Sequence, residues 1–538
     1  MRSAGPGKRA SALLLTAAIG LAGPSVVAVP AAAQEDTTGY ATPPPVSPGM
    51  LPPGGTSPDK NYVQKVGCVE RDLNNQVKLQ NAPWGQQFLR LDEVHRLMRS
   101  TTGAIGKKPN GQPVKVAVID TGVTNHPFFG GRVQGLADYV KTTDKGPGLE
   151  DCDGHGTEVA GIIAAQTPED HAFKGVAPDV QILSIRQSSQ NYAEDDSPPP
   201  AAPPTQPPAG EGQPPGGEEG GEGRPPAGEQ GGEGGTEGAA ATGPAQNGGA
   251  RLQEDEGSAG TLTTLAQAIV HATDSGADVI NASINNCRSA TGSITESEQR
   301  LQAAVRYAVD RDVVVVTAAG NVSDACQQNN QRDPNRPNSI VTPPWFAEDV
   351  LSVAAIDETG GVAPFSMNGP WVSVAAPGTK IISLDPAPGS SQLANLMIEN
   401  GESKEIEGTS FAAPYVAGLA ALVRAKFPDL DAREVMNRIT STAQHPAAPG
   451  GRDNYVGYGV IDPMAALTAM VPEEEGIQPA QAEVLPSDLP PADNRNWTPI
   501  IVALAGSGGA IVALVIALFV VHTIRRNKRT GNPSNRTA

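Results

Sequence analysis

The chain is poor in aromatic residues and in basic charge. Only 4% of its residues are Phe, Trp or Tyr, so a folded core must be built mainly from aliphatic and small side chains. It holds 39 Lys and Arg against 58 Asp and Glu, which gives a formal net charge of −19. Proteins that bind nucleic acid usually present a basic surface, so this balance argues against a nucleic-acid partner.

Cysteine and histidine are also scarce. The chain has 4 Cys and 7 His, the cysteines include no Cys-x-x-Cys pair, and the histidines are scattered. Zinc sites normally draw on closely spaced Cys and His ligands, so the sequence gives no support for one. We expect no metal and no cofactor.

The N-terminus has the pattern of an export signal. A basic start is followed by a mostly apolar run at 12–22, which is too short to span a membrane, and by three alanines at 31–33. This pattern predicts a signal peptide at 1–33, with an ordinary N-terminal helix as the alternative. Export would place the chain in an oxidising compartment, where the four cysteines are expected to pair.

The C-terminus contains a second membrane signal. Residues 499–524 carry no charge and are numerous enough to cross a hydrocarbon core about 30 Å thick. Arg525, Arg526, Lys528 and Arg529 follow directly, and basic residues stay on the cytoplasmic side. We therefore expect a single-pass protein of the cell membrane, with a cytoplasmic tail at 525–538 and the rest extracytoplasmic. A buried core helix is the alternative.

Composition divides the rest of the chain. We expect an N-terminal extension at 34–82 (Pro-rich and mobile over 42–58, then ordered), a large domain at 83–471, and a Pro-rich acidic linker at 472–498. Residues 187–257 consist mainly of Pro, Gly, Glu, Ala and Gln. Such a segment cannot bury enough apolar surface to offset its ordering entropy, which predicts a disordered acidic loop inside the domain.

Within the domain, apolar β-rich runs alternate with helical patterns. The expected strands are 114–119, 181–185, 278–284, 313–317 and 350–355, and the expected helices are 157–165, 262–275, 297–310 and 410–426. This alternation predicts an α/β fold with a mostly parallel central sheet covered by helices on both faces. Sites in such sheets form beyond the carboxyl ends of the strands.

Three short motifs provide the parts of an acyl-transfer site. They are Val-Ala-Val-Ile-Asp-Thr-Gly at 116–122, Asp-Gly-His-Gly-Thr at 153–157 and Gly-Thr-Ser-Phe-Ala-Ala-Pro at 408–414. Each motif alone also fits a plain turn, loop or capped helix. Together they predict a triad in which Ser410 is the nucleophile, His155 its base, and Asp120 the group that orients the imidazole. The glycines beside His155 would let its helix approach the sheet.

Asn321 adds a fourth element to the expected site. It follows the apolar strand predicted at 313–317. Its side-chain amide, together with the backbone N–H of Ser410, would stabilise the oxyanion that forms during acyl transfer. Without the triad, an ordinary turn residue would be the better interpretation of this Asn.

On these motifs, with Gly-Val-Ala-Pro at 175–178 and Gly-Tyr-Gly-Val-Ile-Asp at 457–462, the sequence resembles the subtilisin-like serine proteases, or subtilases, over about 83–467. Their triad has the same Asp…His…Ser order. The resemblance implies a subtilisin-like fold, serine endopeptidase activity, and a substrate-binding edge at Ser283, Ile284 and Asn285. Asn285 stands where the family usually has Gly, and Phe411 where Met is common. The calcium loops of the family are not recognisable.

The overall layout resembles the mycosins, which are membrane-anchored subtilases associated with bacterial type VII secretion systems. Export signal, extension, a Pro-Trp-Gly opening at 83–85, four cysteines, linker and span all match. The resemblance implies exported protein substrates and membrane components of a secretion complex as partners. Two functions remain open: an active endopeptidase, or a structural component of that complex with latent or dispensable activity. The intact triad argues against a third, a binding module with a degenerate site.

The four cysteines allow several pairings. Cys287 and Cys326 each follow an expected strand, and their loops would emerge at the same sheet edge if those strands are neighbours. We therefore expect Cys287–Cys326, which leaves Cys68–Cys152, and the mycosin resemblance implies the same pairs. Cys68–Cys152 would tether the extension near His155, so we expect the extension to be structural and not a released inhibitory segment.

Overall fold

The computed structural model describes residues 41–73, 81–141, 144–195, 258–330, 333, 336–399, 402–477 and 498–529. The chain forms two units, Met1–Glu474 and Glu475–Ala538, which are taken separately below. The expected signal peptide, most of the acidic loop, most of the linker and most of the cytoplasmic tail lie outside the described residues.

The first unit is built around a seven-stranded sheet in which every pairing is parallel. Its strand order is β13-β12-β10-β8-β3-β5-β4. The strands are β3 (Lys115–Asp120), β4 (Val133–Asp138), β5 (Gln181–Arg186), β8 (Val279–Ala282), β10 (Val314–Ala318), β12 (Leu351–Ile356) and β13 (Val374–Pro377). The strands β5 and β4 lie on one side of β3, and β8, β10, β12 and β13 lie on the other. The carboxyl ends of β3 and β8 are therefore adjacent near the centre of the sheet, and sites in such sheets form beyond the carboxyl ends of the strands.

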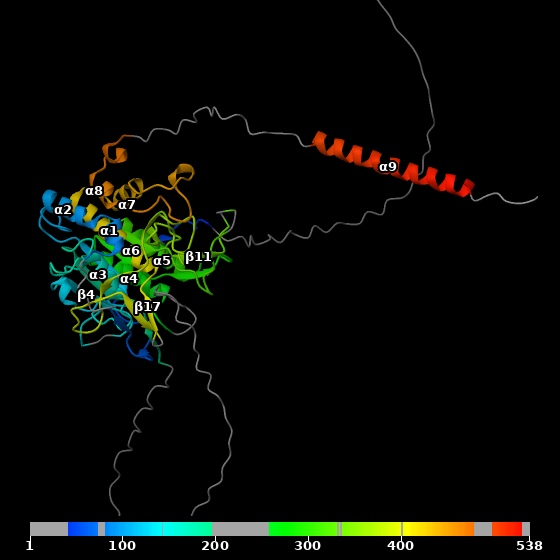
Figure 1. The fold of residues 1–538 in the computed structure, drawn as a ribbon. Helices are drawn as coiled ribbons and strands as arrows, with labels where there is room; N and C mark the ends of the chain where they lie inside the picture. Colours follow the sequence, from blue (N-terminus) through cyan, green and yellow to red (C-terminus); the bar gives the residue numbers. More distant parts are fainter. Residues whose placement is uncertain are drawn as a thin grey trace, which may run out of the picture. The chain divides into compact units, whose positions relative to one another are not determined.

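Two helix pairs pack on this sheet (Figure 1). The helices α3 (His155–Ala164) and α6 (Thr409–Lys426) contact each other and the strands, as do α4 (Leu262–Asp274) and α5 (Glu296–Val309). The central strands are buried along their whole length, as expected for a parallel sheet covered on both faces. The predicted α/β fold with a parallel central sheet is therefore confirmed.

Local sequence explains where these helices begin and how closely they pack. Thr261 and Thr295 begin α4 and α5 with reciprocal capping boxes, which satisfy backbone N–H groups of the first turn. The α6 helix is buried from Thr409 to Ala425 and consists largely of small residues. A Cβ at Gly418 would lie 2.6 Å from Val176 Cβ, so glycine there lets α6 approach the segment after α3.

The expected elements are present, with ends shifted by a few residues, but β4 and β13 were not expected. Both are edge strands with a single neighbour, so neither needs a long apolar run. The sequence of β4, Val-Gln-Gly-Leu-Ala-Asp, is partly polar, and β13 ends in Pro377, which an edge strand tolerates. The other α-helices in the described part of the unit are α1 (Trp84–Phe88), α2 (Leu91–Thr101), α7 (Ala432–Ser441) and α8 (Pro463–Thr468).

The described part of the unit also contains four smaller sheets. They are β1-β6-β7, β11-β9, β14-β15 and β17-β16-β2. Their strands are β1 (Tyr62–Gln64), β2 (Glu70–Asp72), β6 (Ser189–Glu194), β7 (Ser258–Ala259), β9 (Asn286–Ser289), β11 (Ser339–Thr342), β14 (Ser383–Leu384), β15 (Leu393–Ala394), β16 (Leu396–Glu399) and β17 (Glu402–Glu405). Two of these sheets include a strand of the N-terminal extension.

The expectation of a disordered loop over 187–257 is wrong at its start. Residues 187–195 are ordered, because β6 pairs with β1 of the extension and with β7 beyond the loop. Gln187 is buried and donates from Nε2 to Thr264 Oγ1 at 2.8 Å. Average composition over seventy residues conceals this strand, since its partner comes from a distant part of the chain. Residues 196–257 lie outside the described residues.

The Pro-rich stretch at 42–58 is also not free, contrary to expectation. Its backbone carbonyls accept hydrogen bonds from the domain: Pro44 O from Gln302 Nε2 at 2.8 Å, and Gly55 O from the hydroxyl of Tyr139. Both carbonyls lie outside the short 3₁₀ turn at Pro48–Met50, so they are available for such donors. The donors belong to other elements, so composition could not reveal them.

At the other end, the first unit extends slightly beyond the expected boundary at 471. Arg438 on α7 donates from Nε to Glu474 Oε1 at 2.6 Å, which holds the short 3₁₀ turn at Pro472–Glu475 against the domain. In the second unit, α9 (Thr498–Arg529) is described. Within the described part of the chain it is the one helix long and apolar enough to cross a membrane, with a mean hydropathy of 2.5.

Candidate active site

Asp120, His155 and Ser410 lie in one hydrogen-bonded row. His155 Nδ1 is 2.7 Å from Asp120 Oδ1, and His155 Nε2 is 2.8 Å from Ser410 Oγ. All three residues are buried in the domain. The fold thus brings an acid, an imidazole and a hydroxyl, up to 290 positions apart in the sequence, within hydrogen-bond distance of one another.

Each of these residues stands at the end of an element. Asp120 is the last residue of β3, His155 the first of α3, and Ser410 the second of α6. The carboxyl end of a parallel strand and the N-termini of two helices therefore converge on one point, as expected for such sheets. Helix N-termini also present unbonded backbone N–H groups and a positive dipole end to this point.

Gly156 permits the close approach of α3 to β3. A Cβ at this position would lie 2.0 Å from Gly122 O and 3.1 Å from Asp120 Cβ. Distances below about 3 Å to backbone atoms require the backbone to move. The small size of this residue therefore sets the separation between the helix that carries His155 and the strand that carries Asp120.

Although Gly156→Ala adds a single methyl group, it should displace α3 from β3 and so disturb the site. We expect a loss of about 1–3 kcal/mol in the free energy of unfolding, because overpacking strains the surrounding backbone. Displacement of His155 should also reduce the reaction of Ser410 with a fluorophosphonate. Gly67→Ala is the matched control, since nothing lies within 4 Å of a Cβ there. Equal thermal stability of both variants would contradict this account.

Asp151 joins the loop after β3 to the start of α3. Its Oδ1 accepts from Thr121 Oγ1 and from Gly154 N, both at 2.8 Å. Its Oδ2 accepts from the backbone N–H of Thr157 at 2.8 Å and from the Thr157 hydroxyl at 2.6 Å. One buried carboxylate thus holds both segments that carry Asp120 and His155, and it partly satisfies the N-terminus of α3.

Electrostatics around His155 favour its charged form. Burial lowers the pKa of the imidazole, but the charge of Asp120 and its hydrogen bond to Nδ1 raise it, with further contributions from Glu158 and Asp151. The net result is a pKa above the ordinary value of about 6.5. A reaction that needs neutral His155 as base should therefore increase as the pH rises through this elevated pKa.

Asn321 faces the N-terminus of α6. Its Oδ1 accepts from Thr409 N at 3.1 Å and from Thr409 Oγ1 at 2.9 Å. Since Oδ1 is held by Thr409, the residue directly before Ser410, the amide is fixed in orientation beside the row of three residues. This placement fits an Asn whose Nδ2 group donates to an oxygen that develops charge next to Ser410.

The three expected substrate-binding residues follow β8. Ser283 Oγ accepts from Asn281 Nδ2 at 2.8 Å and donates to the carbonyl of Ser410 at 2.9 Å. Ile284 and Asn285 are buried as well. The segment therefore lies beside Ser410, and the Ser283 side chain supports the backbone of the Ser410 turn. The ring of Phe411 lies 4.8 Å from the His155 ring, measured between centroids.

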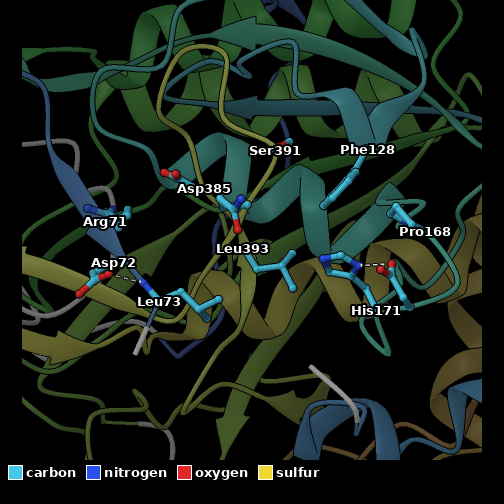
Figure 2. Close-up of a pocket in the computed structure, with 11 residues that line it drawn as sticks. Arg71, Asp72, Leu73, Phe128, Pro168, His171, Asp385, Ser391 and Leu393 are labelled. Atoms are coloured by element: carbon cyan, nitrogen blue, oxygen red, sulfur yellow. Dashed lines mark hydrogen bonds and ion pairs between the residues drawn. The ribbon is translucent and has the colours of Figure 1, made fainter. Parts of the chain in front are cut away.

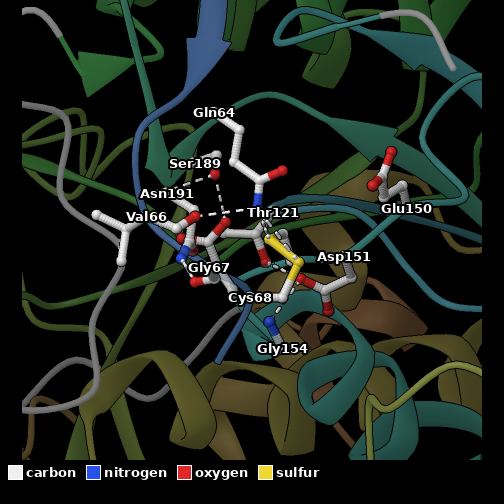
Figure 3. The surroundings of a disulfide bond; sticks show 12 residues. Gln64, Val66, Gly67, Cys68, Thr121, Glu150, Asp151, Gly154, Ser189 and Asn191 are labelled. Carbon is white, nitrogen blue, oxygen red and sulfur yellow. Dashed lines mark hydrogen bonds between the residues drawn. A yellow bond between two sulfur atoms is a disulfide. The ribbon is translucent and has the colours of Figure 1, made fainter. Parts of the chain in front are cut away.

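Both expected disulfides are present. Cys287–Cys326 joins β9, which follows β8, to the loop that follows the neighbouring strand β10. Cys68–Cys152 joins the extension to the loop before α3, and Figure 3 places it next to Thr121, Asp151 and Gly154. Val69 N also donates to Cys152 O at 2.9 Å. The extension is thus covalently attached three residues from His155, and each bridge contributes about 2–4 kcal/mol to stability.

Sequence reasoning missed several residues that support the site, namely Arg71, Thr121, Asp151, Thr157 and Glu158. Asp151 stands four residues before His155, and its acidic character could have indicated a cap for the following helix. Arg71 carries no such signal, because its partner Glu158 is 87 residues away. Among the described residues, no group of three or more His, Cys, Asp or Glu is arranged to hold a metal ion.

Comparison with known proteins gives a consistent result. Residues 111–459 match the model of the subtilase family. Mycosin-1 of Mycobacterium tuberculosis is 36% identical over 477 residues, which cover 86% of this chain and 91% of that protein. A solved structure described as the serine protease MycP1, an essential component of the type VII (ESX-1) secretion system, superposes with a TM-score of 0.62 at 36% identity, covering 80% of this chain and all of the other.

A chain in the periplasmic assembly of the ESX-5 inner membrane complex is similar too. It superposes with a TM-score of 0.63 at 35% identity and covers 84% of this chain and 100% of its own length. The similarity extends well beyond the matched family region, so it includes parts of the extension or the C-terminal segments.

Proposed function

Since the chain belongs to the subtilase family of serine proteases and is mycosin-like, we propose that it is a membrane-anchored, extracytoplasmic endopeptidase that cleaves exported proteins and works with a type VII secretion complex. The observation that carries the proposal is the row of Asp120, His155 and Ser410, with both hydrogen bonds below 3 Å. This geometry suits nucleophilic acyl transfer.

In the proposed mechanism, Ser410 Oγ attacks the scissile carbonyl carbon while His155 Nε2 takes the hydroxyl proton. Asp120 keeps Nδ1 of His155 protonated and stabilises the imidazolium. The amide of Asn321 and the backbone N–H of Ser410 donate to the oxyanion. His155 then returns the proton to the leaving amine, and water hydrolyses the acyl-enzyme by the same steps, with His155 again as base.

The proposal also covers how the substrate binds and where the protein is located. The segment Ser283–Asn285 would pair with the substrate backbone beside Ser410. The uncharged part of α9, which ends before Arg525, Arg526 and Lys528 in the last turns of the helix, would anchor the protein with its tail in the cytoplasm. The expected signal peptide and the two disulfides support an extracytoplasmic domain.

A structural role in the secretion complex is the second candidate function. The similarity to a chain of an inner membrane complex favours it, because that chain is part of a larger assembly. In this case the protein would stabilise the complex, and cleavage would be dispensable. The two functions are compatible and differ in whether Ser410 is needed.

A serine-reactive fluorophosphonate probe on membranes that contain the full-length protein tests the first function. We expect labelling of the wild type and complete loss in Ser410→Ala, while Ser441→Ala, at an exposed serine of α7, should label normally. No labelling of the wild type at any pH would refute an active protease.

Complementation of a deletion strain separates the two functions. If Ser410→Ala restores secretion, the scaffold role is sufficient for secretion. If it does not, cleavage is required. Terminal-peptide mass spectrometry of the secreted proteins, with and without Ser410, would then identify the substrates.

A further inference from the structure

Arg71 of the N-terminal extension reaches the helix that carries His155. Its Nε donates to Glu158 Oε1 at 2.7 Å, and its terminal nitrogen donates to Asp153 O at 3.1 Å. The pair is almost fully buried, with 6% of the Arg71 side chain and 0% of the Glu158 side chain exposed. Burying two charges costs desolvation free energy, so a buried ion pair is not explained by a gain in stability alone.

Glu158 lies close to the catalytic imidazole. His155 and Glu158 are three residues apart on α3, and side chains at this spacing are neighbours on one helix face. A carboxylate there favours the imidazolium form of His155, whereas a nearby cation opposes it. The charge state of the Arg71–Glu158 pair therefore acts directly on the proposed base.

The surroundings of His155 and Glu158 are strongly acidic. Within the described part of the chain, Asp120 from β3 and Asp151 from the loop before α3 act on His155, and Arg71 from β2 and Asp151 act on Glu158. Asp153, from the same loop, acts on Arg71. Burial raises the pKa of Asp153 to about 6, and the charge of Arg186 on β5 opposes that shift. Burial also raises the pKa of Glu158, and Arg71 opposes that shift.

The extension holds Arg71 in place from both sides. Cys68 is bonded to Cys152, and β2 pairs with β16 so that Arg71 is opposite Met397. Asn395 N also donates to Asp72 O at 3.1 Å. Figure 2 shows Arg71 and the residues after it along one side of a pocket of about 750 Å³, with Asp385 and Leu393, at the two ends of the loop between β14 and β15, beside them. The guanidinium is thus fixed before any substrate binds.

We propose that Arg71 is a positioning residue of the catalytic site. It balances the charge of Glu158 next to His155, so the N-terminal extension contributes to catalysis. This inference rests on the proposed function. Because the Cys68 bridge lies three residues from Arg71, the contact would survive a cut in the chain after Leu73. The extension then sets the pH range over which His155 is available as base.

The test compares the pH dependence of fluorophosphonate labelling in four proteins: wild type, Glu158→Gln, Arg71→Met/Glu158→Gln and Glu298→Gln. In Glu158→Gln, the guanidinium stays charged without its partner, since arginine does not lose its proton. We expect the acidic midpoint of the labelling rate to fall by about one pH unit. In the double variant both charges are absent, so the midpoint should return to that of the wild type.

Glu298→Gln is the matched control. Glu298 is likewise a buried glutamate in the first turn of its helix and pairs with Arg288 at 2.8 Å, but it lies on α5. It should leave the midpoint unchanged. A wild-type midpoint in Glu158→Gln, or a shift that persists in the double variant, would overturn the proposal. Circular dichroism checks that each variant is folded.

Two further measurements keep the test decisive. If Glu158→Gln does not fold, Arg71→Gln replaces it and should raise the midpoint; an unchanged midpoint overturns the proposal. Titration of the His155 imidazole by NMR, in the Ser410→Ala background with labelled histidine, measures the same shifts without catalysis. If the wild type is not labelled but the NMR shifts are as expected, the protease proposal fails and the charge coupling stands.

Discussion

The His155→Ala variant should lose about 10⁶-fold in kcat for cleavage of an unfolded protein substrate such as quenched-fluorescent casein. The imidazole is hydrogen-bonded at 2.8 Å to Ser410 Oγ, and an ordinary hydroxyl without a base is a poor nucleophile. Asp120→Asn should lose less, about 10⁴-fold, because it keeps the shape of the site but favours the wrong imidazole tautomer.

The matched control for this prediction is His445→Ala. His445 is exposed and bonds only to backbone carbonyls of Tyr458 and Ser441, so its loss should leave kcat within about twofold of the wild type. Cleavage by His155→Ala at more than a hundredth of the wild-type rate, by protein purified free of host proteases, would show that another group acts as base.

Asn321 should be the next most important side chain for the rate. Removal of one oxyanion donor typically lowers kcat by about 10²–10³-fold with little change in KM. Asn321→Ala would also deprive Thr409 of its acceptor, so Asn321→Asp is the sharper variant. Aspartate preserves an acceptor for the Thr409 N–H and hydroxyl but offers no N–H to the oxyanion.

We expect Asn321→Asp to lose at least as much activity as Asn321→Ala while its thermal unfolding midpoint stays closer to that of the wild type. Thr409→Val is the companion variant, because it keeps the Asn321 amide and removes the hydroxyl that donates to it and accepts from Gly320 N. If Asn321→Asp cleaves at nearly the wild-type rate, the oxyanion is stabilised by other groups.

The charge arrangement links both predictions to pH. Asp120, Glu158 and Asp151 raise the pKa of His155, so the proposed protease would be slow in acid and fast near neutrality and above. Arg71 limits this effect through Glu158. A mycosin-like protease at a membrane would then depend on its own extension for the pH at which it works.

The fold was largely predictable, because its information is local. Continuous apolar runs such as Val313–Val316 mark buried strands, and capping residues such as Thr261 and Thr295 mark helix starts. The expected disulfide Cys287–Cys326 followed from the assumption that two strands are neighbours, and β8 and β10 are paired. Edge strands such as β4 were not predicted, since a strand with only one neighbour does not need a continuous apolar sequence.

The ordered start of the acidic loop was not predicted, for a different reason. Residues 189–194 have a polar composition that suits a disordered segment, yet they pair with Tyr62–Gln64 of the extension. Strand pairing uses backbone groups, which are present in every sequence, so composition cannot exclude it. The Pro-rich stretch at 42–58 is similar, because its carbonyls are bound by donors from α5 and from Tyr139.

The amino-acid sequence alone determined the parallel α/β architecture, the long apolar helix near the C-terminus, and the identity and order of Asp120, His155 and Ser410, since each depends on a short stretch of neighbouring residues. Only the tertiary structure decided what surrounds that row: the Asp151 bridge between strand and helix, the Thr409 hold on Asn321, and Arg71 against Glu158. Those contacts join residues that no local pattern relates, and their strength comes from burial, which exists only after the chain has folded.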